Sequence, residues 1–197
     1  MSSTLVWRKI QQGDEEAFRQ LYDQYADLLY GYGMKIAGDD ALVTDAIQSL
    51  FVYIFEKRKT CAVPQSISAY LCVSLRHMIV NALKKENSGV LKSLDELDAN
   101  DYPFELEIDI ETAIIRSELE KEQLEVLQKE LNSLTKQQRE VLYLKYYKKM
   151  DSEEIARVMG ITSRTVYNTT HMAITQLRER LSKSFLIAML ANLWIFN

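Results

Sequence analysis

The chain has 197 residues, of which 47% are hydrophobic, and contains only two prolines and six glycines. This length and composition favour a soluble, all-α protein of one or two small domains with a real core. Two cysteines, Cys61 and Cys72, are too few and wrongly spaced for a metal framework, so we expect ordinary thiols in a reducing cytosol. The N-terminus lacks the apolar run of a secretory signal.

The formal net charge of −4 is distributed unevenly along the chain. Residues 1–85 carry ten Lys/Arg against nine Asp/Glu, residues 86–130 four against fourteen, and residues 131–197 ten against five. Binding to phosphate depends on the local field of the face that docks, so the total does not exclude a nucleic-acid partner. The acidic middle is predicted to be a separate segment.

Two long helices are expected first. Asp14 is a suitable N-cap for a helix that keeps apolar residues at helical spacing to about Ala37. A second helix is expected from about Asp39 to Lys57. Its outward positions include Asp45, Gln48, Ser49, Val52 and Glu56. An outward apolar residue among polar ones suits a partner surface, although one exposed valine needs no special explanation.

A basic loop, residues 58–66, leads into a third helix that Ser66 or Ser68 caps and that ends near Lys85. The loop and helix together offer the polar and aromatic residues Lys59, Tyr70, Arg76, His77, Asn81 and Lys84. Positive charge combined with an aromatic ring can hold single-stranded nucleic acid by attraction and base stacking. The same pattern also fits an ordinary solvated face, and the residues alone leave both open.

Residues 86–110 form the acidic segment, which is predicted to be a linker that either lies along a basic groove of a partner or is solvated. A helix is expected to resume at Glu111. The stretch 133–138 breaks it and starts the next helix, where Thr135 and Gln138 have the spacing of a capping box. That helix is expected to continue to about Lys149.

Residues 151–180 are predicted to form a helix-turn-helix. Asp151 and Glu154 make a capping box, Gly160 suits a left-handed helix exit, and Thr162 caps the second helix. Val166, Thr170, Ala173, Leu177 and Leu181 fall on its inner stripe. The outer face then carries Arg164, Tyr167, Asn168, His171, Thr175 and Arg178. Such side chains can hydrogen-bond base edges or phosphates in a major groove, and the alternative is a solvated face.

The final segment, residues 184–197, is an apolar tail. It is shorter than the about 20 apolar residues that a membrane-spanning helix needs, so we expect no transmembrane segment. Three interpretations remain open, in this order: packing on the protein's own helices, docking to a partner, and shallow membrane contact.

Over about residues 10–182 the chain resembles the sigma-70 family, specifically its extracytoplasmic-function group. The stretch GDEEAFRQLYDQYADLLYGYGMKIAGD resembles the group's first helix, and TDAIQSLFVYIFEKR resembles the helix that binds RNA polymerase in relatives. The stretch SAYLCVSLRHMIVNALKK resembles the helix that melts and reads the minus-ten element, and LNSLTKQQREVLYLKYYKKMDSEEIARVMGITSRTVYN resembles the domain that reads the minus-thirty-five element. The recognition helix departs from the family at Tyr167, Thr169 and Met172, where Lys or Arg is usual, so fewer phosphate contacts are expected.

The resemblance implies a domain organisation and a role for each part. Residues 1–87 would be a region 2 domain, 88–110 the acidic linker, 111–183 a region 4 helix-turn-helix domain, and 184–197 the apolar tail of unknown role. The polymerase-binding residues would be Asp45, Gln48, Ser49, Val52 and Glu56. The minus-ten contacts would be Lys59, Tyr70, Arg76, His77, Asn81 and Lys84. The minus-thirty-five contacts would be Arg164, Thr165, Tyr167, Asn168, His171 and Arg178.

The resemblance therefore predicts a cytoplasmic, non-enzymatic sigma factor whose partners are core RNA polymerase, promoter DNA and an anti-sigma factor. It implies no cofactor, no metal, no catalytic residue and no small-molecule substrate. A stand-alone helix-turn-helix regulator that binds duplex DNA without polymerase is the main alternative, and it would not need residues 45–56 as a partner face. An enzyme is disfavoured because His77 and His171 are isolated and the chain has no glycine-rich phosphate loop.

Overall fold

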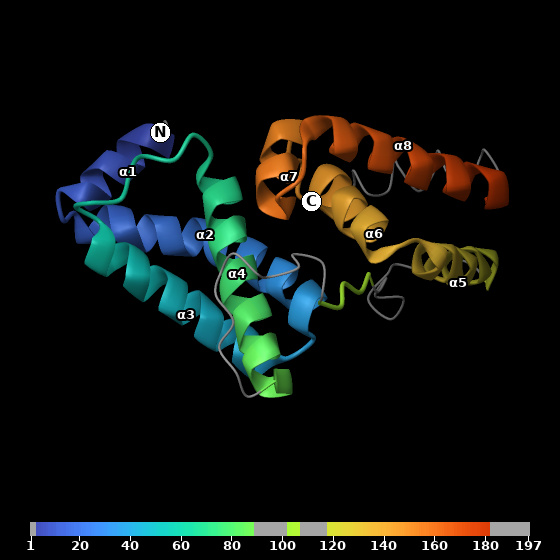
Figure 1. The fold of residues 1–197 in the computed structure, drawn as a ribbon, viewed down its shortest axis with the longest axis horizontal. Helices are drawn as coiled ribbons and strands as arrows, with labels where there is room; N and C mark the ends of the chain where they lie inside the picture. Colours follow the sequence, from blue (N-terminus) through green and yellow to red (C-terminus); the bar gives the residue numbers. More distant parts are fainter. Residues whose placement is uncertain (1–2, 89–101, 107–117, 182–197) are drawn as a thin grey trace. The chain divides into compact units, whose positions relative to one another are not determined.

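The computed structural model describes residues 3–88, 102–106 and 118–181, which form helices, turns and loops without a strand (Figure 1). The all-α prediction is confirmed. The chain divides into two compact units, one built mainly from residues 1–103 and the other mainly from residues 104–197. Most of the expected linker, the start of the helix expected from Glu111, and the tail 184–197 lie outside the described residues.

The helices of the first unit are α1 (Ser3–Gln11), α2 (Glu15–Ala37), α3 (Asp40–Lys57) and α4 (Ile67–Ser88). The expected caps are present. The Asp14 carboxylate accepts from the amide of Ala17 at 3.0 Å, and the Asp39 carboxylate accepts from the amide of Leu42 at 2.9 Å. Ser66 rather than Ser68 begins α4, since its hydroxyl accepts from the amide of Ala69 at 3.2 Å. Each cap satisfies a backbone donor that the helix itself leaves without a partner.

Helices α2, α3 and α4 pack against one another around a common apolar core (Figure 1). They approach closely at Gly33 of α2, where an added Cβ would lie 2.7 Å from Val43 of α3 and 3.1 Å from Ile79 of α4. Any larger residue there would require the side chain of Val43, or the helix that carries it, to shift. The buried stripe of α3 consists of Val43, Ala46, Ile47, Leu50, Phe51 and Ile54, which leaves the positions expected to face outward on its other side.

Helix α1 was not expected from the sequence. Its Trp7 and Ile10 side chains are each 1% exposed, so this nine-residue helix is docked through two large apolar residues. Burial of each contributes about 2 kcal/mol, which a helix too short to be stable alone requires.

The second unit contains α5 (Glu118–Ser133), α6 (Lys136–Leu142), the π-helical turn η2 (Tyr143–Tyr147), α7 (Ser152–Met159) and α8 (Ser163–Arg180). The capping boxes at Thr135 and Asp151 are confirmed. Gly160 has a φ of +65°, and Thr162 caps α8 by accepting from the amide of Thr165 at 3.1 Å. The predicted helix-turn-helix, α7 to α8, is therefore present.

The helix expected to run to about Lys149 instead ends in a π turn. The amide of Lys148 bonds to the carbonyl of Tyr143 at 3.0 Å, a five-residue step, and Lys149 then takes a φ of +55°. The wider turn lets the rings of Tyr143 and Tyr147 stack at 5.1 Å, with the Lys148 ammonium over both. A π turn with stacked tyrosine rings therefore takes the place of the last regular α-helical turn.

Part of the expected acidic linker is anchored. The Tyr102 side chain is 5% exposed, and its hydroxyl accepts a hydrogen bond from Nη2 of Arg76 at 3.1 Å. The Phe104 side chain is 1% exposed and meets the ring of Tyr143 edge-on at 5.7 Å, while Arg139 donates to the Phe104 carbonyl at 2.9 Å. Each of these two aromatic residues is thus held by the unit to which it belongs.

Candidate partner and nucleic-acid interfaces

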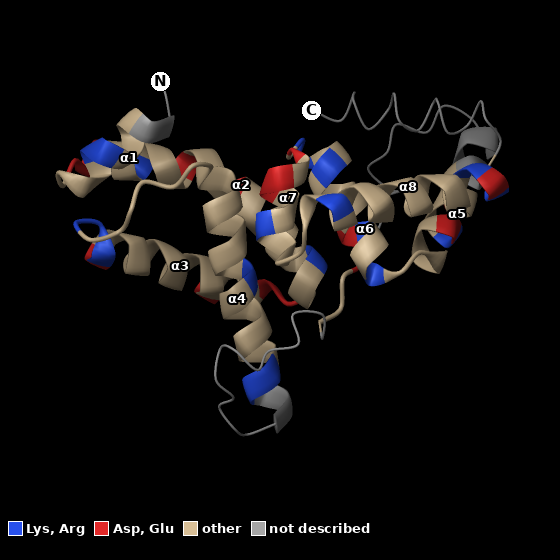
Figure 2. Cartoon of the chain, turned by 45° about the horizontal axis from the view of Figure 1, so that its top comes forward, with Lys and Arg blue, Asp and Glu red and all other residues tan. Residues whose placement is uncertain are grey.

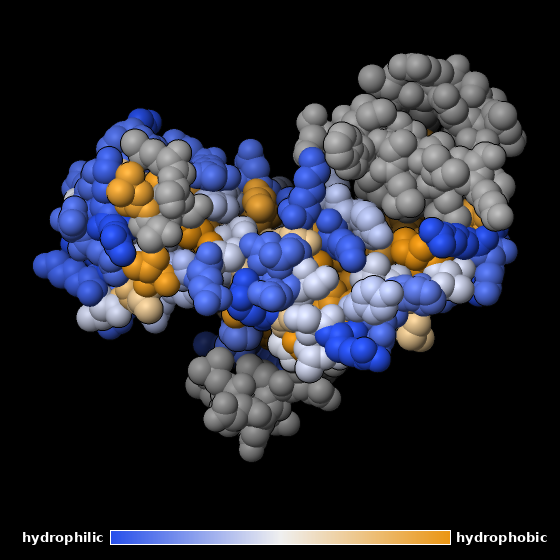
Figure 3. All heavy atoms as spheres, turned by 90° about the horizontal axis from the view of Figure 1, so that it is seen from above, coloured by the Kyte–Doolittle hydropathy of each residue, from blue (hydrophilic) through white to orange (hydrophobic). Residues whose placement is uncertain are grey.

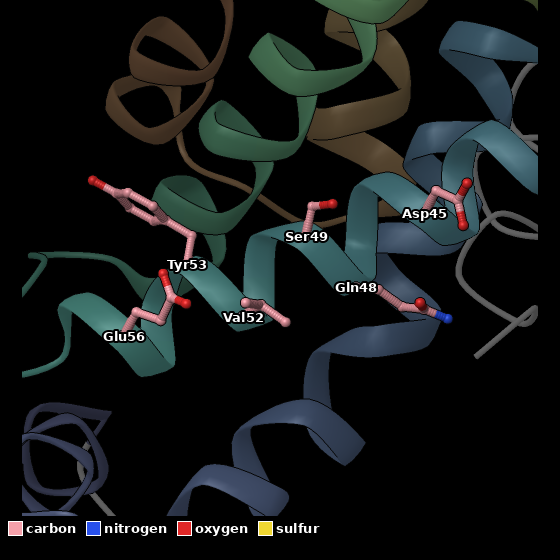
Figure 4. A pocket seen from close by; sticks show the side chains of 6 residues that line it. All are labelled: Asp45, Gln48, Ser49, Val52, Tyr53 and Glu56. Atoms are coloured by element: carbon pink, nitrogen blue, oxygen red, sulfur yellow. The ribbon is translucent and has the colours of Figure 1, made fainter.

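The outer side of α3 forms an open groove. It is lined by Asp45, Gln48, Ser49, Val52, Tyr53 and Glu56. Asp45, Ser49, Val52 and Glu56 follow one another at steps of four, three and four, and Gln48 and Tyr53 flank this row, so all six side chains project from one side of a single helix (Figure 4). Val52 is 56% exposed and Tyr53 is 46% exposed, which leaves apolar surface between two carboxylates.

The structure brings together all five residues that the sequence suggested for polymerase contact, and it adds Tyr53. Tyr53 lies four residues after Ser49 and eight after Asp45, so its place on this face was available from the helical spacing. The groove is held in shape by the buried side of α3. There the ring of Phe51 meets Phe18 at 6.0 Å and Tyr22 at 4.8 Å, both edge-on.

The loop after α3 and the face of α4 carry the candidate minus-ten residues. Tyr70, His77, Asn81 and Lys84 lie seven, four and three residues apart, which places them along one side of α4. Lys59 lies on the loop and is exposed. Figure 2 shows Lys and Arg at the turn after α3 and again toward the C-terminal end of α4. His77 and Asn81 are exposed, whereas Tyr70 and Lys84 are half-buried.

Two ionisable groups on α4 are shifted toward their neutral forms. Burial, with a smaller contribution from Cys61, raises the pKa of Tyr70 to about 12. The side chain of His77 is exposed overall but partly desolvated, and this partial burial, followed by the positive charge of Arg76, lowers the pKa of His77 below its ordinary value. At neutral pH this face therefore presents an uncharged phenol and an uncharged imidazole.

Arg76 differs from the expectation of a polar outward residue. Its side chain is 3% exposed, and the guanidinium lies 4.9 Å from the centre of the Tyr102 ring while bonding to the Tyr102 hydroxyl. The reason is helical phase, because Arg76 precedes His77 by one residue and so lies about 100° around the helix. A DNA contact through Arg76 would require Tyr102 to move.

Helix α8 presents the candidate minus-thirty-five residues. Arg164, Tyr167, Asn168, His171 and Arg178 are exposed, and Tyr167 reaches 64% exposure. Thr165 is half-buried and its hydroxyl lies 2.8 Å from that of Thr162, so it takes part in the helix cap. Met172, named above only as a departure from the family and not as a candidate contact, is 62% exposed beside Asn168 on the adjoining turn.

The opposite side of α8 fixes this orientation. Ala173 and Leu177 are fully buried in a cluster that also contains Leu127 and Leu131 of α5 and Leu142 of α6. Arg180, near the end of the helix, is paired with Glu130 at 3.0 Å. The residues left facing outward are therefore those the inner stripe predicted.

Comparison with known proteins identifies both units. Residues 21–101 match the family described as Sigma-70 region 2, and residues 124–177 match Sigma-70, region 4. Two curated relatives are ECF RNA polymerase sigma factors. The chain is 26% identical over 175 residues to BldN of Streptomyces coelicolor and 24% identical over 169 residues to SigL of Mycobacterium tuberculosis. The chain belongs to the extracytoplasmic-function (ECF) group of the sigma-70 family.

The matches cover most of this sigma factor but differ in how much of each relative they span. The match to BldN covers 88% of this chain and 63% of the relative, and the match to SigL covers 84% and 89%. Solved structures share the fold. CnrH, in complex with the cytosolic domain of CnrY, is 17% identical with a TM-score of 0.55, covering 90% of this chain and 95% of CnrH. RpoE of Bartonella quintana, in complex with the anti-sigma factor NepR, is 18% identical with a TM-score of 0.57, covering 84% and 97%.

Within residues 3–88, 102–106 and 118–181, His, Cys, Asp and Glu side chains form no group of three suited to a metal ion. None of the described helices is both long enough and apolar enough to cross a membrane. On the face drawn in Figure 3, apolar side chains appear as separate patches among hydrophilic ones.

Proposed function

We propose that this sigma factor binds core RNA polymerase through the α3 groove, opens the minus-ten element with the loop 58–66 and α4, and reads the minus-thirty-five element with α8. The observation that carries the proposal is the groove, because five residues chosen from sequence line one exposed face together with Tyr53. Exposed apolar surface with polar groups around it is typical of a protein interface.

The charge of the groove favours a protein partner over DNA. Its lining contains two carboxylates, Asp45 and Glu56, and no Lys or Arg. Carboxylates repel phosphates, whereas Val52 and Tyr53 supply the apolar and aromatic surface that protein interfaces bury at their centre. A stand-alone DNA-binding regulator would have no use for this combination, so the groove favours the sigma factor.

The minus-ten role rests on the side of α4 that carries Tyr70, His77, Asn81 and Lys84. An aromatic ring beside positive charge suits unpaired bases, since every base has a flat face that can stack. Lys59 adds a charge from the loop. Arg76 is held by Tyr102, so we assign it a place in this interface only after the linker residue has moved away.

The minus-thirty-five role rests on α8. Arg164, Asn168 and His171 can donate or accept hydrogen bonds at base edges, and Tyr167 and Met172 can contact thymine methyl groups. The first turns of a recognition helix usually make the base contacts, and these residues lie there. Arg178, further along, suits a phosphate.

The protein's surroundings follow from this role. It acts in the cytoplasm as an initiation factor, without a cofactor, a catalytic residue or a small-molecule substrate of its own. An anti-sigma factor is a further partner, supported by the fold that the chain shares with RpoE, which was solved with the anti-sigma factor NepR. The acidic linker would run through the RNA-exit side of polymerase, where its charge resembles that of RNA.

The test is a pull-down and transcription assay with purified core RNA polymerase. The native chain is compared with a triple variant, Asp45→Ala, Gln48→Ala and Val52→Asp, which removes polar contacts and places a charge at the centre of the groove. We expect the native chain to bind core and start transcription at specific promoters, and the triple variant to lose both.

A matched control carries the same three kinds of substitution at exposed positions outside the groove: Asp23→Ala, Gln24→Ala and Val126→Asp. It should behave as the native chain does. If the native chain shifts duplex DNA but neither binds core nor initiates, the stand-alone regulator replaces the sigma factor. If groove and control variants lose core binding equally, the groove is not the polymerase site.

A further inference from the structure

We infer that α1 positions the loop 58–66 for promoter opening. Gln11 holds the loop, and Trp7 holds the ring of Tyr70, in the conformation that contacts DNA. The inference rests on the proposed minus-ten role of the loop and of α4. It assigns a task to a helix that has no part in the groove on α3 or in the recognition helix α8. Gln11 and Trp7 act through the loop and are positioning residues.

The loop begins with a closed turn. The amides of Thr60 and Cys61 both bond to the carbonyl of Lys57 at 2.9 Å, and the Thr60 hydroxyl donates to the same carbonyl at 3.0 Å. Arg58 folds back with its guanidinium 4.1 Å from the centre of the Phe55 ring. Lys59 is left exposed at the tip of this turn.

Gln11 of α1 holds the end of this turn, at Cys61. Its side-chain amide donates to the carbonyl of Cys61 at 2.7 Å, across 50 residues of sequence. This contact is partly buried. If the Gln11 donor were lost, water could replace its hydrogen bond to the Cys61 carbonyl only in part, so the present loop conformation would be destabilised. A loop of this length has many conformations, and one fixed point in its middle removes most of them.

Trp7 fixes the aromatic end of the same surface. Its ring is 1% exposed and meets the ring of Tyr70 edge-on, with centroids 5.5 Å apart. Tyr70 is half-buried, and its phenol, which is protonated at neutral pH even without the rise of its pKa to about 12, presents a neutral ring. The two α1 residues thus hold the backbone below Lys59 and the orientation of Tyr70.

Figure 1 shows the segment between α3 and α4 running past α1. The residues that line the groove are all on α3, and α1 contributes none of them. Releasing the loop should therefore impair promoter opening and leave core binding unchanged. A general loss of stability would impair both, which separates positioning from a merely structural role.

The experiment uses the full chain with core polymerase and compares Gln11→Met with Gln12→Met. Methionine keeps the length of glutamine without the donor, and Gln12 is the exposed neighbour of Gln11. The promoter is a genomic fragment selected because the native holoenzyme transcribes it. Four quantities are measured: affinity for core, the thermal midpoint, the rate of duplex opening, and the labelling rate of the Cys61 thiol, since Cys72 is 0% exposed.

We expect Gln11→Met to open the duplex about fivefold more slowly and to label at Cys61 about fivefold faster, the ratio that one ordinary hydrogen bond supports. Its core affinity should equal that of Gln12→Met. Equal opening rates in the two variants overturn the inference alone, and so does a parallel loss of core affinity or folding. If the native holoenzyme opens no fragment, the proposed function fails and the inference falls with it.

Discussion

The groove on α3 and the outer face of α8 are built in the same way and carry opposite charge. Each is the outward side of one helix whose inner stripe is buried in its own unit. The groove contains Asp45 and Glu56 without a Lys or Arg. The candidate reading face of α8 contains Arg164 and Arg178 without an Asp or Glu.

In these two helices, periodicity and charge carry different information. Helical periodicity decides which residues face outward, and it serves both helices equally well. Charge then decides the class of partner, because carboxylates repel phosphates and arginines attract them. An exposed tyrosine is present on each face, Tyr53 and Tyr167, so aromatic surface alone does not distinguish the two.

The largest expected effect comes from replacing Tyr53 by alanine. Tyrosine is prominent among residues that dominate protein interfaces, and truncation of such a residue costs about 2 kcal/mol or more, which is about thirtyfold in affinity. We therefore expect Tyr53→Ala to weaken binding to core polymerase by about that factor. Titration of labelled chain with core polymerase measures it.

Tyr167→Ala is the matched control, since it removes an exposed tyrosine from the other face. It should leave core affinity unchanged and weaken binding of the holoenzyme to promoter DNA. If the two variants exchanged these effects, or affected both partners alike, the assignment of the two faces by charge would be wrong.

A smaller effect is expected from Arg164→Ala. Loss of one arginine that faces DNA should lower promoter affinity about tenfold and reduce the slope of log affinity against log salt by about one. Arg180→Ala is the control, because Arg180 is paired with Glu130 and should contribute less. A series of binding measurements at increasing salt tests both variants, and equal slopes for the two would contradict the role given to Arg164.

The helical framework and both candidate faces could be predicted from sequence because they depend on local physics. Capping needs residues three apart, as in Thr135 and Gln138, and amphipathic faces need only a period of 3.6. Tyr53 is the exception. Its spacing places it in the groove, but an aromatic side chain on an outward position gives no sign of whether it is covered.

Other features depend on contacts between distant residues. Helix α1 is short, and its docking through Trp7 and Ile10 depends on surfaces that other helices supply. The burial of Arg76 depends on Tyr102, which lies 26 residues later in a segment whose composition favours solvent. The sequence shows each of these residues but not which distant residues they contact.

The smallest effect is expected at His77, which lies on the candidate minus-ten face of α4. Its pKa is lowered by burial and by Arg76, so the imidazole is neutral near pH 7.5. We therefore expect His77→Gln to leave the salt dependence of promoter binding unchanged, whereas Arg164→Ala reduces it.

The stability of the protein against pH gives a second readout for His77. Because the pKa of His77 is lower in the folded chain than its ordinary value of 6.5, the unfolded chain binds a proton there more readily than the folded chain does. As the pH falls through 6.5 toward the lowered pKa, the native protein should therefore lose stability relative to His77→Gln. Above it the two should respond to pH alike. Urea unfolding of both chains across this range measures the difference, and a native chain that instead gained stability on acidification would mean that His77 holds its proton in the folded state and reads DNA as a cation.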